Sequence, residues 1–294
     1  MSYDAWILLT GSLVGLTCGV TGALLVLRKM SMLADAISHT VLLGIVGAFF
    51  VTQSLNGLPM FIGAAIVGVL TAFFVQMLDS SGVQSDAAIG VVFTSLFALG
   101  VVLISFVGDS VHLDVEHALM GEIAFIPWDT LNFQGMNLGP KAVWMLGSVF
   151  LINILVITLF YKEIKLTTFD PQFAVLLGIP VMFIHYLLMG MISLSTVASF
   201  DSVGAILVVA MLIVPGATAY LLTDRFLVLL ILSGLIGILS AITGFAFAVW
   251  SNVSIAGSIA CATGLYFILA FIFSPKHGVL MKKIRNDKFS SSQP

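Results

Sequence analysis

Charged residues are scarce in this chain, since Asp, Glu, Lys and Arg together make up 9% of its 294 residues. A soluble domain carries about 25% charged residues, so this composition excludes a soluble globular protein. Hydrophobic residues account for 60% of the chain, and its mean hydropathy is +1.17. In hydrocarbon the backbone must satisfy its own hydrogen bonds, which favours helices. We therefore predict an all-α polytopic membrane protein with no nucleic-acid partner.

Cysteine is rare in the sequence, and the common nucleotide-binding motifs are missing from it. The two cysteines, Cys18 and Cys261, fall inside apolar runs and predict neither a disulfide framework nor a zinc ribbon. The sequence contains no Gly-x4-Gly-Lys-Ser/Thr loop and no Gly-x-Gly-x-x-Gly fingerprint. We expect no enzyme activity, no catalytic residue and no permanently bound cofactor. If transport here needs ATP, another chain must supply the ATPase.

Nine apolar runs have lengths near the ~20 residues that a helix needs to cross a bilayer. They cover approximately residues 5–27, 31–53, 58–78, 86–107, 140–161, 179–199, 203–222, 226–250 and 253–273. The seventh run holds Pro215-Gly216 near its middle. If that run is only a half-helix, the number of spans falls to eight. We predict a single transmembrane domain over residues 1–275, followed by a tail over 276–294.

Lys and Arg set the predicted orientation, because cytoplasmic loops are enriched in both. An N-terminus outside the cell leaves Lys141 as the one basic residue on the outer side. The C-terminal tail and the segment 162–178 are then cytoplasmic, and the segment 108–139 is extracellular. The outer segment is acidic and holds His112 and His117, to which the sequence assigns no role. Its acidity would concentrate cations, although an ordinary solvated loop explains it equally well.

Two polar residues, Asp35 and His39, interrupt the second apolar run. Residues four apart lie on one face of a helix, and an ionisable group inside a span is by default a candidate functional residue. Carboxylate and imidazole together form half of a divalent-metal site, with Ser38 as a candidate for orienting the imidazole. The alternative is that the pair forms only a satisfied polar contact. His185 in the sixth run is more typical of a packed histidine than of a ligand.

The segment 162–178 is predicted to carry a short helix. Thr168 or Asp170 can serve as its N-cap, Pro171 suits its first position, and Gly178 can end it. Apolar side chains on a cytoplasmic helix favour a protein partner, although such a helix can also rest on lipid headgroups.

Five sequence blocks resemble one family, the permease subunits of bacterial ABC importers for manganese, zinc and iron, called ABC-3. The blocks are Leu27–Gly44, Asp86–Phe93, Glu116–Gly121, Phe169–Ala174 and Gly204–Ala219. One departure is Leu43, where the family usually has Pro. The sequence looks most like the manganese branch, but the signature does not separate the metals.

The resemblance implies a type II importer permease in the bacterial cell membrane. It implies a dimer with itself or with a similar permease, two cytoplasmic ATPase subunits, and an extracellular lipoprotein or solute-binding protein that delivers the metal. Asp35 and His39 would bind the ion in transit at the dimer axis. The segment 169–178 would be the coupling helix that docks into the ATPase. Its expected contact residues are Phe169, Asp170, Pro171, Gln172, Phe173, Ala174, Leu177 and Gly178.

Two other classes of function stay open at this point. An ion-driven secondary metal transporter would work without an ATPase, and it predicts inverted repeats and several charges within the membrane. An intramembrane metalloenzyme would need a general base beside the metal, and the sequence contains no His-Glu-x-x-His run.

Overall fold

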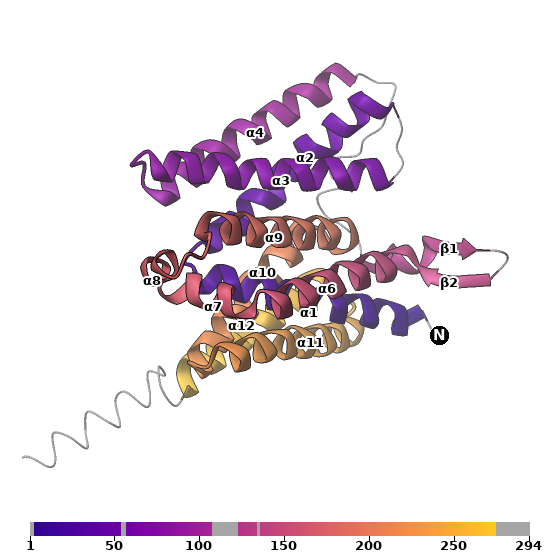
Figure 1. Ribbon diagram of the computed structural model, residues 1–294. Coiled ribbons are helices and arrows are strands. Elements are labelled where there is room, and N and C mark those ends of the chain that lie inside the picture. Colours follow the sequence, from indigo (N-terminus) through magenta and orange to yellow (C-terminus); the bar gives the residue numbers. More distant parts are fainter. Residues whose placement is uncertain (1–2, 54–56, 108–122, 134–135, 275–294) are drawn as a thin grey trace, which may run out of the picture.

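The computed structural model describes residues 3–53, 57–107, 123–133 and 136–274. Helices dominate this part of the chain (Figure 1). The elements are, in chain order, α1 (Tyr3–Leu27), α2 (Ser31–Thr52), α3 (Gly57–Ser80), α4 (Ser85–Val107), η2 (Ile123–Trp128), β1 (Thr130–Phe133), β2 (Met136–Pro140), α6 (Lys141–Leu159), α7 (Tyr161–Phe169), α8 (Pro171–Leu176), α9 (Val181–Val203), α10 (Ala205–Leu222), α11 (Phe226–Ser251) and α12 (Ile255–Phe273).

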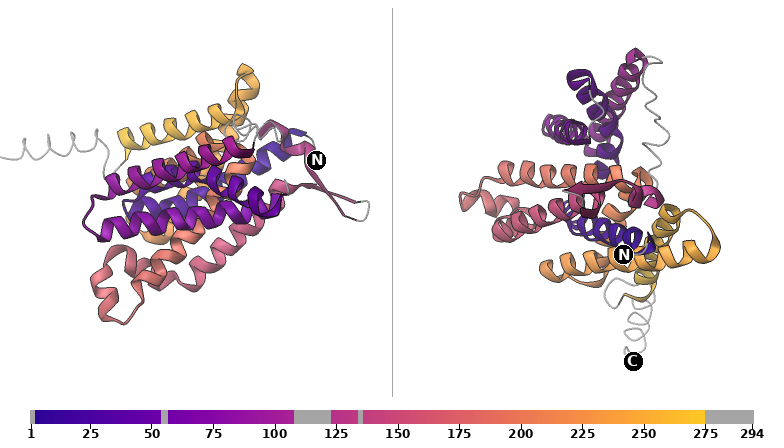
Figure 2. Two further views of the ribbon diagram at one scale, coloured as in Figure 1. Left: turned by 90° about the horizontal axis from the view of Figure 1, so that it is seen from above. Right: turned by 90° about the vertical axis from the view of Figure 1, so that its right-hand side faces the viewer.

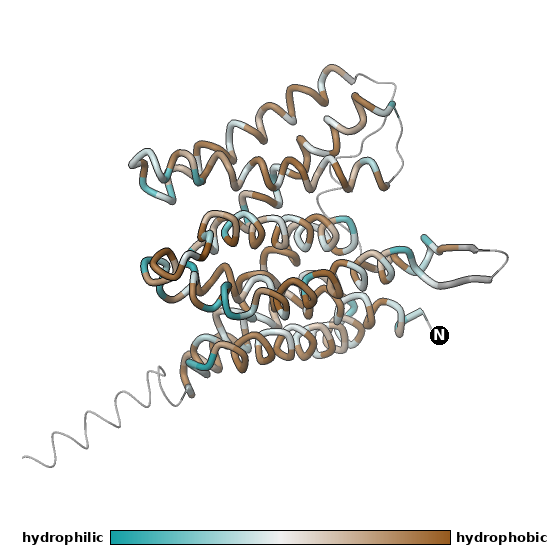
Figure 3. Tube along the Cα trace, viewed as in Figure 1, coloured by the Kyte–Doolittle hydropathy of each residue, from teal (hydrophilic) through white to brown (hydrophobic). Residues whose placement is uncertain are grey.

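Nine helices in the described residues are long and apolar enough to cross a membrane, which confirms the predicted all-α class and the number of spans. The predicted boundaries are close to the observed ones, and the largest difference is at the end of the sixth span, which continues to Val203. The hydrophobic residues run along the helices, while many hydrophilic residues gather at their ends (Figure 3).

The seventh span is one continuous helix, α10, of 18 residues, so the count of eight does not apply. Pro215 lies inside it and is buried. Membrane helices tolerate an internal proline where neighbouring groups satisfy the freed backbone carbonyl. A single residue, Gly204, separates α9 from α10 and has φ +81°. Glycine adopts this backbone conformation without steric cost, and the chain therefore reverses within one residue.

The helices form two groups in space. α2, α3 and α4 make a layer of their own, and α9 and α10 lie between this layer and the helices α1, α11 and α12 (Figures 1 and 2). The hydroxyl of Ser193 in α9 donates a hydrogen bond to the backbone oxygen of Ala65 in α3, at 3.0 Å. A buried polar contact of this kind joins helices where lipid offers no hydrogen-bond partner.

The N-terminus and the hairpin β1–β2 lie at one end of the molecule, and α7 and α8 lie at the other (Figure 1). The hairpin is antiparallel and belongs to the segment 108–139, for which the sequence indicated only a loop. Beside it, the ammonium of Lys141 lies 2.6 Å from a carboxylate oxygen of Asp129. His112, His117 and the tail 276–294 lie outside the described residues.

Glycines let α1 approach its neighbours closely. A Cβ added to Gly15 would lie 2.5 Å from the backbone carbon of Gly237 in α11, so the two backbones are in direct contact there. Further along α1, the backbone oxygen of Gly19 accepts a hydrogen bond from the Ser233 hydroxyl of α11. Small residues at helix interfaces permit such contacts. The sequence showed that this face of α1 is packed, and the structure adds that its partner there is α11.

We expect Gly15→Ala to lower the thermal unfolding midpoint of the protein in detergent, because the new methyl overlaps with the α11 backbone. Overpacking of this kind costs about 1–3 kcal/mol. The matched control is Gly147→Ala, since nothing lies within 4 Å of a Cβ at that position in α6. The control is expected to be neutral or slightly stabilising, because Ala has a higher helix propensity than Gly. Equal midpoints for the two variants would contradict the close packing of α1 on α11.

Candidate metal-binding pair and surface helix

Asp35 and His39 lie on one face of α2, as their spacing predicts. A carboxylate oxygen of Asp35 is 3.5 Å from Nε2 of His39. At 1.5 Å rise per residue, the two residues lie about 6 and 12 Å from the first residue of α2. In a helix of 22 residues, Asp35 is therefore nearer to the first residue than to the middle, while His39 is nearer to the middle.

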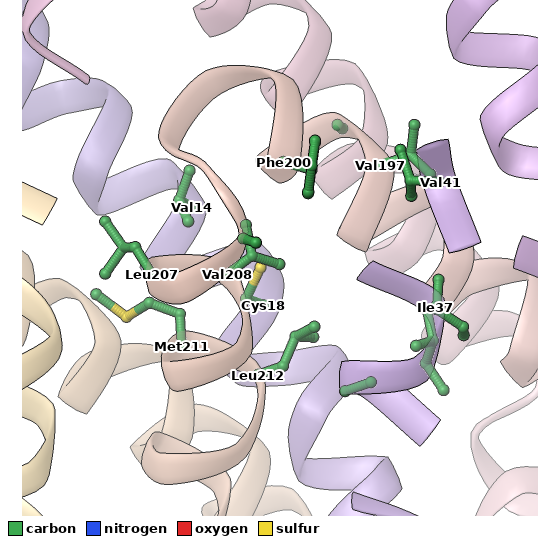
Figure 4. Packing of buried hydrophobic residues seen from close by; sticks show 14 of the residues in the cluster. Val14, Cys18, Ile37, Val41, Val197, Phe200, Leu207, Val208, Met211 and Leu212 are labelled. Carbon is green, nitrogen blue, oxygen red and sulfur yellow. The ribbon is translucent and has the colours of Figure 1, made fainter. Parts of the chain in front are cut away.

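The opposite face of α2 holds this helix to the rest of the protein. Ile37 and Val41 are buried and belong to the same cluster as Val197 and Phe200 of α9 (Figure 4). Positions two apart on a helix are separated by about 200°. Asp35 and His39 consequently point away from the packed side of α2.

Aromatic rings from α4 partly cover the histidine. The His39 ring centroid lies 5.3 Å from that of Phe93 and 5.9 Å from that of Phe97. The two side chains nevertheless keep much of their surface uncovered within this chain, with 49% of Asp35 and 35% of His39 accessible. A carboxylate facing hydrocarbon is costly, so this face of α2 requires water or a further protein surface against it.

The contact between Asp35 and His39 also bears on the alternative of a satisfied polar pair. They do contact each other, but about half of the Asp35 side-chain surface is left without cover. A self-contained polar contact would be expected to bury both groups. The described residues contain no group of three or more His, Cys, Asp or Glu side chains that could hold a metal ion. The described part of the chain thus offers two donors at this place, fewer than a transition metal requires.

Ser38 is fully buried, and its hydroxyl donates to the backbone oxygen of Asp35 at 2.7 Å. This hydrogen bond lies within the helix, one turn back. The suggestion that Ser38 orients the imidazole stays a prediction.

The segment 162–178 forms two helices rather than one. α7 follows α6 after the single residue Phe160, and the sequence analysis missed it, because hydropathy ends a span where charged residues begin. Its Ile164 is fully buried, so α7 is packed on the protein and is not a solvated loop.

α8 has the ends that its sequence predicts, although it is short, with six residues. Of the two candidate N-caps, Asp170 is the one used, and its carboxylate accepts a hydrogen bond from the Phe173 amide at 2.9 Å. Pro171 occupies the first helical position, and Gly178 follows the helix with φ +76°. Thr168 has a different role, since its hydroxyl accepts a hydrogen bond from the guanidinium of Arg28.

Most of the α8 side chains are exposed. We call the exposed apolar residues here the α8 surface, which consists of Phe169, Phe173, Val175, Leu176 and Leu177. Leu176 is 83% exposed and Phe173 is 48% exposed, while Ala174 is buried against the protein. The ring of Phe169 also packs edge-on against Phe226 of α11, with centroids 6.0 Å apart. Gln172 is exposed as well. An exposed apolar patch of this kind is typical of an interaction site.

Arg28 and His185 form a cluster that the sequence analysis did not find. The terminal nitrogen Nη1 of Arg28 lies 3.4 Å from Nδ1 of His185, so this histidine is a packed residue with a polar neighbour. The sequence placed Arg28 only as a positive charge on the cytoplasmic side. Pairing of residues 157 positions apart has no signal in local spacing.

Removing the N-cap of α8 should loosen that helix. We expect Asp170→Ala to speed hydrogen–deuterium exchange in the peptide 169–178 by about fivefold, since a lost N-cap costs about 1 kcal/mol. Asp170→Ser keeps an oxygen that can accept from the Phe173 amide and is expected to exchange nearly as slowly as the wild type. Exchange at the wild-type rate in Asp170→Ala would show that the cap does not hold α8.

Three comparisons place the chain among known proteins. Residues 2–274 match the family described as the ABC 3 transport family. The chain is 66% identical to the manganese transport system membrane protein MntD of Bacillus subtilis, with 97% of each sequence covered. It is 42% identical to the zinc transport system membrane protein TroD of Treponema pallidum, over 94% of this chain and 75% of that protein.

A solved structure shares the fold. PsaBC from Streptococcus pneumoniae, in complex with Fab, contains a chain that superposes with a TM-score of 0.79 at 33% identity, covering 96% of both chains. The family match spans nearly the whole described structure, and the similarity to MntD extends over the same length. This multi-pass membrane protein therefore belongs to the ABC 3 transport family.

Proposed function

We propose that this chain is the membrane permease of an ATP-driven importer for a divalent transition metal, and that the metal is manganese. The observation that carries the proposal is the Asp35–His39 pair, which faces away from the packed side of α2 in a member of this family. The similarity to a manganese transport protein at 66% identity supports the choice of metal. Relatives named for zinc and iron transport make these two metals the natural competitors.

The proposed site is completed by a second permease chain. A two-fold axis repeats the same patch on both subunits, so two copies of the pair supply two carboxylates and two imidazoles. This donor set suits Mn²⁺ or Zn²⁺ and is too rich in nitrogen for Mg²⁺ or Ca²⁺. The same arrangement covers the exposed surface of Asp35 and His39. It thereby avoids the free-energy cost of a carboxylate that faces lipid.

The proposed cycle is alternating access, with the N-terminus outside and the C-terminus in the cytoplasm. An extracellular metal-binding protein releases the ion toward the dimer axis, where it exchanges water for Asp35 and His39. Two ATPase subunits dock on the α8 surface, whose exposed apolar side chains fit a protein partner. ATP binding and hydrolysis move α8, and the opening of the passage changes from one side of the membrane to the other.

The proposal is tested with vesicles that contain the permease, its ATPase and any second permease. Mn²⁺, Zn²⁺ and Fe²⁺ are offered together. The metals that accumulate are measured by elemental analysis, with and without ATP on the side of the membrane that holds the ATPase. We expect ATP-dependent accumulation with manganese in excess. Accumulation of zinc or iron instead would change the metal, and uptake that is independent of ATP would favour a secondary transporter and overturn the proposal.

Asp35→Ala and His39→Ala should each lower manganese uptake by more than about tenfold, because each removes a metal donor from both halves of the site. The amount of permease that co-purifies with the ATPase should stay the same, since neither residue contributes to the α8 surface. Asp4→Asn, an exposed carboxylate in the first turn of α1, is the control for loss of charge. Uptake at the wild-type level in either alanine variant would remove the site assignment.

A further inference from the structure

Arg28 lies in the short turn between α1 and α2. Its backbone amide still bonds to Leu24 of α1 at 3.2 Å, and α2 begins three residues later, at Ser31. The neighbouring Lys29 has φ +59°, which turns the chain into the new helix. Asp35 follows Arg28 by seven residues, about 6 Å into α2 at 1.5 Å per residue. The side chain of Arg28 is thus attached almost directly to the helix that carries the proposed metal donors.

The guanidinium of Arg28 makes three contacts with other elements. Nη2 donates to the hydroxyl of Thr167 at 2.9 Å, and Nε donates to the hydroxyl of Thr168 at 3.3 Å. Nη1 lies 3.4 Å from Nδ1 of His185 in α9. Because a guanidinium can only donate, Nδ1 must accept, which requires a neutral imidazole with its hydrogen on Nε2. The three contacts therefore join the start of α2 to the last turn of α7 and the first turns of α9.

Among the described residues, the charge of Arg28 has no counter-ion. Burial lowers the pKa of the Arg28 guanidinium to about 10, so the side chain stays cationic at neutral pH. Within the described ranges of the chain, no Asp or Glu oxygen forms an ion pair with it. The planar guanidinium of arginine has donors in fixed positions, so it specifies the geometry of its contacts better than the ammonium of lysine does. This arrangement suits a residue that holds three elements in register.

An open pocket of about 730 Å³ lies beside the contacts of Arg28. Residues from the α1–α2 turn, α3, α7, α8 and α9 line it, including Arg28, Thr167, Thr168 and His185. Pro171 and Val175 of α8 also line it. The hydrogen bonds of Arg28 therefore lie along the wall of this pocket.

We propose that Arg28 is a positioning residue that couples movement of α7 and α8 to α2, and hence to Asp35 and His39. Thr167 and Thr168 are followed at once by Phe169 and the N-cap Asp170, so a shift of α8 displaces both hydroxyls. The guanidinium carries this displacement to the beginning of α2. The inference rests on the proposed function, because it assigns to Arg28 the link between the ATPase contact and the metal site.

The test measures the number of manganese ions imported for each ATP hydrolysed, in vesicles that hold the complete transporter. The first variant is Arg28→Lys, which keeps the positive charge but loses the planar set of guanidinium donors. The second is Thr167→Val with Thr168→Val, which keeps side-chain volume but removes both acceptors. Each is expected to lower the ratio by about two- to thirtyfold, the range of a coupling contribution from residues that touch neither ligand. Metal binding at Asp35 and His39 and co-purification with the ATPase are expected to be unchanged.

Two control variants separate coupling from stability. Thr167→Ser with Thr168→Ser keeps both hydroxyls and should retain the wild-type ratio. Lys29→Asn removes the exposed neighbouring charge at a position with positive φ, which Asn tolerates. It should also leave the ratio unchanged. A merely structural role would reduce uptake and ATP hydrolysis in proportion, and the ratio would not move.

The outcomes distinguish this inference from the proposed function. If wild-type vesicles import manganese with ATP but the lysine and valine variants keep the wild-type ratio, Arg28 does not couple the two sites and the proposed function stands. If the variants lose transport and hydrolysis together, the cluster is structural and the inference is overturned. If wild-type vesicles show no ATP-dependent uptake, the proposed function itself fails. Should Arg28→Lys not assemble, the valine pair decides, because it leaves the arginine in place.

Discussion

A carboxylate inside a membrane span needs a polar or charged neighbour, and this requirement governs how α2 can be used. One face of α2 carries Ile37 and Val41 and packs against α9, while the other carries Asp35 and His39 and is only partly covered by two phenylalanines of α4. The two faces require different surroundings, because one is apolar and buried while the other carries polar groups that require polar contacts. The described part of the chain satisfies the first requirement, and it leaves the second to a further surface or to solvent.

Much of the fold could be predicted because the bilayer allows so few solutions. Nine apolar runs of suitable length give nine helices, and their ends are marked by residues such as Asp170 and Gly178 that act through local chemistry. The pairing of Asp35 with His39 follows from the helical repeat alone. Each of these features lies within one continuous stretch of the chain, so it can be recognised in the sequence.

What could not be predicted depends on residues far apart in the chain. The glycines of α1 indicate close packing, but only the structure identifies Gly237 of α11 as a partner. The contact between Arg28 and Thr167 joins residues 139 positions apart, and no spacing rule connects them. α7 was missed for a different reason, because its charged residues interrupt the hydropathy pattern, and the burial of Ile164 is a tertiary effect. The hairpin β1–β2 was missed because four- and five-residue strands leave little pattern.

The direct contact between the α1 and α11 backbones has a mechanical consequence. Where Gly15 and Gly237 touch, no side chain lies between the helices to change its rotamer and absorb a shift. Neither helix can rotate about its own axis there without collision, and α1 and α11 must travel as a rigid block through any change of shape.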